Sequence, residues 1–296
     1  MLLKNYKTTF LKKLSSLYDE QEIDSFFYII LEKLHGLKRI DLALNPSNVM
    51  DGNHLKKWNS IVSDLKVNKP IQYILGETEF YGLRFEVNEN TLIPRPETEE
   101  LVEIIIKNEG KRKREEGKVR ILDIGTGSGC IAISLAKNIP NTEVYAIDVS
   151  EEALAIAKKN ADINAVKVSF VNVDILKIND LKQFPSSNFP LPTYFDIIVS
   201  NPPYVRNLEK AEIKPNVLEY EPHLALFVDD IDALLFYRKI AELAIKNLNP
   251  NGKLYFEINQ YLGKETVELV ESFGFKNVKL IKDIYGNDRI VFAEKE

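Results

Sequence analysis

Ile121-Leu122-Asp123-Ile124-Gly125-Thr126-Gly127-Ser128-Gly129 is the stretch from which the fold can be worked out. Its first four residues are mostly apolar and predict a buried strand, and residues 130–138 after it predict a helix. The three alternating glycines between them predict a tight turn whose backbone closely approaches a ligand. A dinucleotide-binding loop needs a glycine where this chain has Cys130, and a P-loop needs a lysine that this stretch lacks. The turn therefore predicts another kind of ligand, or a plain turn without one.

Downstream of this turn, strand and helix patterns alternate. We expect strands at residues 119–124, 143–147, 167–171, 195–200 and 253–258, and helices at 130–138, 151–160 and 233–248. Alternation of this kind predicts an α/β domain with a mostly parallel sheet flanked by helices. Ligands of such sheets bind at the carboxyl ends of the strands.

Upstream, the pattern changes twice. Residues 1–68 carry apolar side chains at helical spacing and predict a small helical bundle, either without a site of its own or with an added binding surface. Residues 69–96 predict a β-hairpin linker, in which Ile71, Tyr73 and Leu75 alternate like a strand and the prolines at 94 and 96 exclude helix. Residues 97–296 then form the predicted catalytic domain.

Composition limits the classes of partner. The net charge is −5; residues 1–68 carry +2 and the remainder −7, which argues against direct nucleic-acid binding. The sequence has no apolar run of the ~20 residues that span a bilayer and no signal-peptide core. A single cysteine and three scattered histidines predict no disulfide and no metal site. We expect a cytoplasmic, monomeric protein that contacts no membrane.

An alternating glycine turn after the acidic strand residue Asp123 resembles the first motif of class I methyltransferases. This resemblance implies S-adenosyl-L-methionine as cofactor, S-adenosyl-L-homocysteine as product and a Rossmann-like, mostly parallel seven-stranded sheet. The expected cofactor-binding residues of the loop are Gly125, Thr126, Gly127, Ser128 and Gly129. Asp123 could face the positively charged amino-acid end of the cofactor.

Two further acids follow strand ends. Asp148 can accept hydrogen bonds from both ribose hydroxyls, or it can serve as the N-cap of the helix that starts near Ser150. Asp174 and Ile175 would lie beside the adenine, with Asp174 accepting from its amine and Ile175 packing on the ring. A surface turn is the alternative for that pair.

The tetrapeptide Asn201-Pro202-Pro203-Tyr204 stands at the end of the strand expected at 195–200. A planar NH2 group offers two in-plane donors, which the Asn201 side-chain oxygen and the Pro202 carbonyl can accept. Pro203 stiffens the turn, and Tyr204 can cover the planar acceptor and exclude water. Asn201, Pro202 and Tyr204 are therefore the predicted catalytic residues, and the whole tetrapeptide is the predicted substrate site.

The linker motifs suggest which planar nitrogen is methylated. Residues 70–76, 79–82, 85–87 and 92–99, together with Glu221-Pro222 and Asp288-Arg289, resemble the HemK-type glutamine methyltransferases over nearly the whole chain. The resemblance implies that the substrate is the glutamine of the Gly-Gly-Gln loop in class 1 peptide chain release factors. It also implies that Asn201 contacts the cofactor. Residues 227–233 depart from the family, because two or three glycines are missing there. An amino-methyltransferase acting on a base of ribosomal RNA or DNA is the alternative, and a catalytically silent module that binds a translation factor is another.

Overall fold

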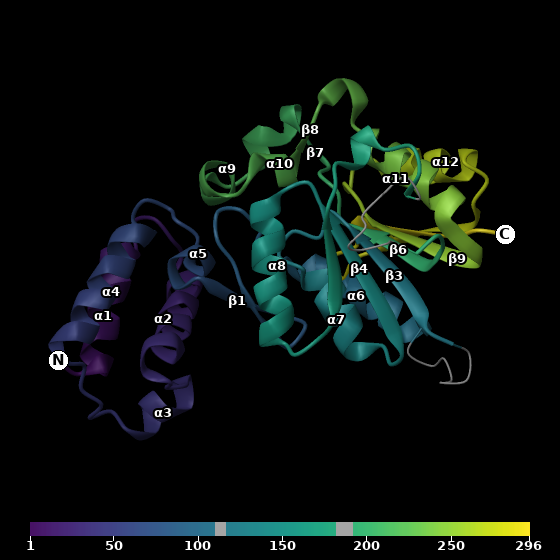
Figure 1. Ribbon diagram of the computed structural model, residues 1–296. Coiled ribbons are helices and arrows are strands. Elements are labelled where there is room, and N and C mark those ends of the chain that lie inside the picture. The colour runs from purple at the N-terminus through teal and green to yellow at the C-terminus, as the bar shows by residue number, and fades with distance from the viewer. Residues whose placement is uncertain (110–116, 182–191) are drawn as a thin grey trace. The chain divides into compact units, whose positions relative to one another are not determined.

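A computed structural model describes residues 1–109, 117–181 and 192–296, and their contacts divide the chain into two compact units (Figure 1). One unit comprises Met1–Gly76 and Lys214–Tyr220, and the other comprises Glu77–Ile213 and Glu221–Glu296. Each unit has hydrophobic core residues of its own.

The first unit is a helical bundle with an aromatic core. Its helices are α1 (Leu3–Leu14), α2 (Glu20–His35), α3 (Arg39–Leu44), α4 (Gly52–Leu65), α5 (Ile71–Leu75) and α9 (Pro215–Tyr220). Phe10, Phe27 and Trp58 come from three of these helices and are fully buried. Their ring centroids lie 5.1–5.8 Å apart, within the range of favourable aromatic pairs. The predicted N-terminal helical domain is confirmed.

Two of the three histidines expected to be scattered lie together in this unit. The rings of His35 and His54 stack with their centroids 4.5 Å apart. The Trp58 indole donates to Nε2 of His35 at 3.0 Å, which requires a neutral imidazole at that nitrogen. Burial, and then the neighbouring His54, lower the pKa of His35. The pair is part of the packing of the bundle.

The expected strand at 71–75 is wrong, because α5 occupies those residues. Gly76 ends this helix with a φ of 72°, a left-handed conformation that suits glycine. The hairpin lies just after it, formed by β1 (Glu77–Phe80) and β2 (Leu83–Glu86). Its two-residue turn, Tyr81 and Gly82, has positive φ at both positions, as a type I′ turn requires.

The second unit is built on a seven-stranded sheet of order β10-β11-β9-β6-β3-β4-β5. The strands are β3 (Val119–Ile124), β4 (Thr142–Asp148), β5 (Val168–Asn172), β6 (Phe195–Ser200), β9 (Leu248–Glu257), β10 (Lys276–Lys282) and β11 (Asp288–Glu294). The five adjacent strands β9, β6, β3, β4 and β5 are parallel, and β11 pairs antiparallel with both β9 and β10. The predicted α/β fold with a mostly parallel seven-stranded sheet is confirmed.

Helices cover both faces of this sheet. They are α6 (Pro96–Glu109), α7 (Cys130–Asn138), α8 (Glu151–Ile163), α11 (Leu235–Asn247) and α12 (Gly263–Ser272). Successive residues of a strand face opposite sides, so Ile121 packs in the core with α6 and α7 while Leu122 packs in the core with α11 and α12. Near-continuous apolar strands such as β3 are what a doubly covered parallel sheet requires.

Pro96 is the first residue of α6, although the sequence predicted that it excludes helix. Proline is accepted at a first helical position because its missing N–H would have no partner within the helix there.

Shorter elements surround the carboxyl end of the sheet. They are β7 (Val205–Arg206), β8 (Phe227–Val228), α10 (His223–Leu226) and the 3-10 helices η2 (Ile175–Lys177), η4 (Asn207–Glu212) and η5 (Asp230–Asp232). β7 and β8 pair in parallel. The segment where the family's glycines are missing therefore forms β8 and η5, and the Asp229 side chain caps η5 by accepting from the Ile231 N–H at 3.0 Å.

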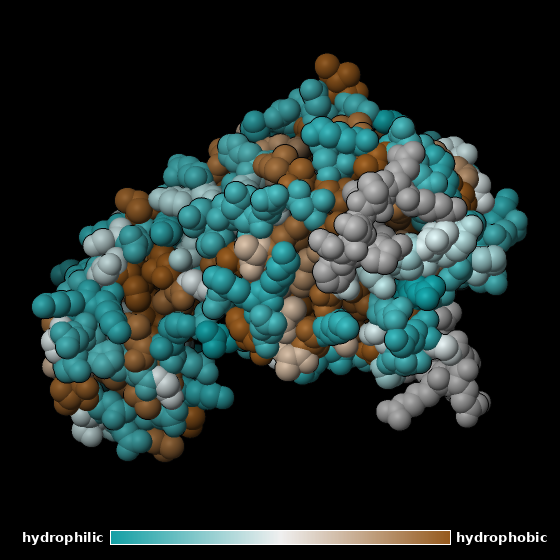
Figure 2. Space-filling view, in the orientation of Figure 1, coloured by the Kyte–Doolittle hydropathy of each residue, from teal (hydrophilic) through white to brown (hydrophobic). Residues whose placement is uncertain are grey.

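Figure 2 shows hydrophilic residues over much of the visible face, with hydrophobic ones between them. In the part of the chain that the structure describes, every helix is too short or too polar to span a membrane.

Candidate active site

The glycine loop lies between β3 and α7, beside the point where the strand order reverses. The N–H groups of Gly125 and Thr126 both donate to the Ile147 carbonyl, at 2.9 and 3.1 Å, which joins the loop to β4. Gly125 and Gly127 line a pocket at the carboxyl ends of the strands, and their φ angles are 74° and 54°. A Cβ added at either meets no protein atom within 4 Å, so space for a ligand is open beside their backbones.

Gly129 serves a different purpose from the two glycines before it. A Cβ there would meet Ile133 Cδ1 at 2.9 Å and the Ala157 Cβ at 3.2 Å, and φ is 83°. The third glycine of the loop is thus required by the packing of α7 against α8, and it is not among the pocket-lining residues.

Asp148 ends β4 and lines the same pocket. Its Oδ2 accepts from the Gly127 N–H at 2.8 Å and its Oδ1 from the Ser150 N–H at 3.0 Å. Burial raises the pKa of this carboxyl, while the backbone hydrogen bonds oppose the rise. The N-cap of α8 is Ser150, whose hydroxyl accepts from the Ala153 N–H at 3.0 Å. Each Asp148 oxygen keeps a second lone pair for a ligand hydroxyl.

Asp174 and Ile175 also line this pocket. Asp174 caps η2, accepting from the Leu176 N–H at 3.0 Å, and its other oxygen lies 2.9 Å from Lys177 Nζ. The pair therefore forms a surface turn and a pocket wall at once, and the two predicted alternatives are compatible.

The tetrapeptide follows β6, and three of its members, Asn201, Pro202 and Pro203, line the same pocket as Gly125 and Gly127. The Ser200 hydroxyl donates to the Ile124 carbonyl at 2.6 Å, which holds the ends of β6 and β3 together. The two motifs that the sequence placed at strand ends thus meet at one site.

Three residues predicted for the site, Tyr204, Thr126 and Ser128, are not among the residues that line the pocket. The Tyr204 hydroxyl donates to Glu257 Oε1 at 3.1 Å, and its carbonyl accepts from Asn259 Nδ2 at 2.9 Å. Thr126 and Ser128 are buried in the loop.

Asp123 differs from its expected position. It is fully buried, its Oδ2 accepts from the Thr126 hydroxyl at 2.6 Å, and it does not line the pocket. Burial raises the pKa of the Asp123 carboxyl to about 7, against the opposing hydrogen bond from Thr126. The carboxyl therefore holds the glycine loop through its hydrogen bond with Thr126 and does not face a ligand in the pocket.

Several lining residues were missed from the sequence. They belong to the segment after β2 and to the region from α10 to α11, namely Glu89, Asn90, Leu92, Leu224, Ala225 and Phe236. The Arg95 guanidinium lies 2.5 Å from the buried Glu221 carboxylate, which also accepts from the Ile93 N–H at 3.2 Å. This ion pair joins the two missed segments. The only sequence signal was that both partners fall in family motifs.

The pocket has features that S-adenosylmethionine requires. Val149, Ile175 and Phe236 supply apolar surface for a flat ring, and Asp148 supplies an acceptor for hydroxyl groups. The open space beside Gly125 and Gly127 lets a ligand pass close to the backbone.

Comparison with known proteins points the same way as this geometry. Residues 115–282 match the family model of a methyltransferase domain, and residues 8–76 match that of the PrmC N-terminal domain. The chain is 64% identical to the release factor glutamine methyltransferase of Flavobacterium psychrophilum, over 98% of both chains. It is 43% identical to the protein of that name from Bacteroides thetaiotaomicron, over 96% of this chain and 97% of the other.

Among solved structures, the 16S rRNA N2 G1207 methyltransferase of T. thermophilus, in complex with AdoMet and guanosine, is similar with a TM-score of 0.50. The sequences are 19% identical, and the match covers 74% of this chain and 50% of that one. Similarity at this level shows a shared fold and leaves the substrate undetermined.

Proposed function

This chain belongs to the release factor glutamine methyltransferase family, and on that premise we propose that it methylates class 1 peptide chain release factors. The methyl group of S-adenosylmethionine goes to the side-chain amide nitrogen of the glutamine in their Gly-Gly-Gln motif. The observation that carries the proposal is the meeting of Asn201 and the glycine loop in one pocket, within a chain 64% identical to a named family member.

S-adenosylmethionine, when bound, supplies an electrophilic methyl group on a sulfonium sulfur. Gly125 and Gly127 would leave room for it, and Asp148 would accept from its ribose hydroxyls. Asp174 would accept from the adenine amine, and Ile175 would pack on the ring. Thr126, Ser128 and Gly129 would shape the loop from within.

Asn201 and Pro202 would orient the acceptor nitrogen. An amide nitrogen is a weak nucleophile because its lone pair is delocalised, so its placement decides the rate. The Asn201 side-chain oxygen and the Pro202 carbonyl would accept the two N–H groups and turn the face of the nitrogen toward the methyl group. Pro203 would keep the turn rigid, and Tyr204 would fix the end of the tetrapeptide through its hydrogen bonds with Glu257 and Asn259.

Methylation with labelled cofactor tests the proposal directly. Purified release factor and ribosomal RNA would be offered together, with a release factor whose Gly-Gly-Gln glutamine is alanine as the control. We expect label on the intact release factor and none on the control. Label on ribosomal RNA alone would support the alternative acceptor and overturn the proposal.

We further propose that the chain acts as a monomer in the cytoplasm and does not bind nucleic acid directly. The support is the translation-factor substrate and the net charge of −7 over residues 69–296. Light scattering after size exclusion tests the monomeric state, and an RNA-binding titration tests the absence of direct nucleic-acid binding.

A further inference from the structure

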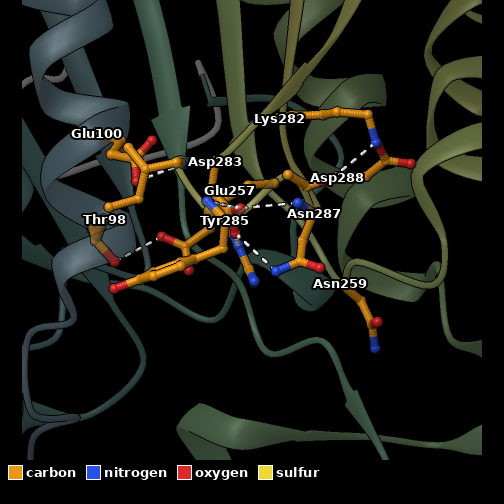
Figure 3. A network of polar contacts seen from close by, with 12 residues as sticks. Thr98, Glu100, Glu257, Asn259, Lys282, Asp283, Tyr285, Asn287 and Asp288 are labelled. Atoms are coloured by element: carbon orange, nitrogen blue, oxygen red, sulfur yellow. Dashed lines mark hydrogen bonds and ion pairs between the residues drawn. The ribbon is translucent and has the colours of Figure 1, made fainter.

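A buried carboxylate lies next to the tetrapeptide and receives two side-chain hydroxyls. Glu257 is the last residue of β9 and is 1% exposed. Its Oε2 accepts from the Thr98 hydroxyl of α6 at 2.6 Å, a contact visible in Figure 3, and its Oε1 accepts from the Tyr204 hydroxyl at 3.1 Å. Burying a carboxylate costs free energy that an apolar side chain would avoid, which calls for an explanation.

The Thr98 hydroxyl connects this carboxylate to Asn201. Asn201 Nδ2 donates to Thr98 Oγ1 at 3.3 Å. A hydroxyl has one hydrogen and two lone pairs. Because Thr98 gives its hydrogen to Glu257, it can only accept from Asn201, and only the NH2 end of the Asn201 amide can donate.

The direction of these hydrogen bonds selects one of two orientations of the Asn201 side chain. With the amide nitrogen held against Thr98, the amide oxygen Oδ1 is the other end of the planar amide group and does not face Thr98. A flipped Asn201 would place two lone-pair-bearing oxygens against each other at Thr98. It would also present its NH2 group to the substrate's own N–H donors.

We propose that Thr98 and Glu257 are positioning residues, which hold the Asn201 amide with Oδ1 ready to accept an N–H of the substrate glutamine. The inference rests on the proposed function, because it assigns that role to the Asn201 oxygen. Glu257 also holds the hydroxyl of Tyr204, so one buried carboxylate orients both ends of the tetrapeptide.

Substitutions at Thr98 test the proposal, because valine matches threonine in shape and lacks the hydroxyl. The methyl-transfer rate is measured with intact release factor at saturating cofactor. For Thr98→Val we expect kcat to fall about 10- to 100-fold, the size of effect that a misplaced reacting group produces. The KM for S-adenosylmethionine should change less than about threefold. Thr98→Ser keeps the hydroxyl and should retain most of kcat.

Thr266→Val is the matched control. Thr266 is also fully buried, and its hydroxyl donates to the Leu262 carbonyl at 2.7 Å within α12, away from the pocket. It should lower the melting temperature about as much as Thr98→Val while leaving kcat unchanged.

The outcomes separate the two levels of the argument. An inactive wild-type enzyme would refute the proposed function. An active wild type in which Thr98→Val and Thr266→Val have the same kcat would refute only the positioning role. Equal losses for Thr98→Val and Thr98→Ser would also refute it, because the hydroxyl would then be immaterial.

Discussion

Asn201 has the polar side chain of the tetrapeptide that lines the pocket, together with Gly125 and Asp148. Within the described residues, the Asn201 side chain makes one hydrogen bond to α6, in which its Nδ2 donates to the Thr98 hydroxyl. A side chain that only orients the substrate stabilises the transition state of the reaction and adds little to the stability of the fold. Its loss should therefore affect the rate and spare the stability.

For Asn201→Ala we expect turnover to be abolished, with a fall in kcat of at least about 100-fold. The melting temperature should stay close to that of the wild type. Asn277→Ala is the control, because Asn277 is exposed and its side chain donates to Glu294, at 2.6 Å, on the far strand pair β10–β11. Turnover retained in Asn201→Ala would show that the amide does not hold the acceptor nitrogen.

Asp123 predicts a pH dependence of stability. The pKa of its carboxyl is about 7 in the folded chain, against an ordinary value of 3.8. A raised pKa means that the folded state binds the proton more tightly than the unfolded state. The stabilisation is therefore complete below about pH 4 and is lost as the pH rises through about 7.

Asp123→Asn removes this titration and keeps an acceptor for the Thr126 hydroxyl. Melting temperatures of the cofactor-free proteins, measured from pH 4 to pH 8, give the difference between variant and wild type. We expect this difference to shift in favour of the variant as the pH rises to about 7 and then to level off. A difference that does not vary with pH would contradict the buried, proton-binding state of Asp123.

Among the elements, α8 connects the hairpin to the glycine loop through one buried side chain. Asn160 Oδ1 accepts from the Glu86 N–H at 2.6 Å, and its Nδ2 donates to the carbonyls of Glu86 and Ser128 at 3.0 and 2.9 Å. The segment that starts at Glu86 continues to the pocket-lining residues Glu89 and Leu92. Asn160 therefore helps to place two walls of the site.

Asn160→Asp would turn the donating end of this side chain into a charged acceptor that faces two carbonyls. We expect the free energy of unfolding to fall by at least about 2 kcal/mol, because buried polar groups would lose their partners. Denaturant unfolding measures the change. The control is Asn138→Asp, an exposed position whose Nδ2 donates to the Ser134 carbonyl at 2.9 Å. Equal effects of the two variants would show that the bridge contributes nothing.

Elements with strong local signals could be predicted from the sequence. The strands at 119–124 and 195–200 and the helix at 130–138 have the bounds that the patterns indicated. They are apolar stretches bounded by glycine, asparagine or proline, so local patterning and tertiary packing agree. The glycine loop and the tetrapeptide then had to meet, because carboxyl ends of neighbouring parallel strands share one edge.

Other features depended on information that local patterns do not contain. Alternating Ile71, Tyr73 and Leu75 fit a strand and a short helix equally well over five residues, and the capping Gly76 favoured the helix. The Arg95–Glu221 pair joins positions 126 residues apart, which no periodicity reveals. Asp123 occupies the strand position expected for a cofactor contact, yet packing placed it under the loop.

At the scale of the whole molecule, we propose a helical domain at 1–68, a hairpin linker at 69–96 and a catalytic domain at 97–296. Trp58 is the chain's one tryptophan and is fully buried in the helical bundle, so its fluorescence reports on that unit. Far-UV circular dichroism reports on all helices and strands together. We expect denaturant transitions followed by the two signals to differ in midpoint, because units with separate cores need not unfold together. Coincident transitions would argue for a single cooperative unit.

The account as a whole depends on which atom receives the methyl group. Mass spectrometry of release-factor peptides, taken after incubation with the enzyme and S-adenosylmethionine, locates that atom most directly. The account predicts one added methyl group on the side-chain amide of the Gly-Gly-Gln glutamine, and an unmodified peptide when the enzyme carries Asn201→Ala. A methyl group on another residue, or an unmodified release factor beside methylated ribosomal RNA, would contradict it.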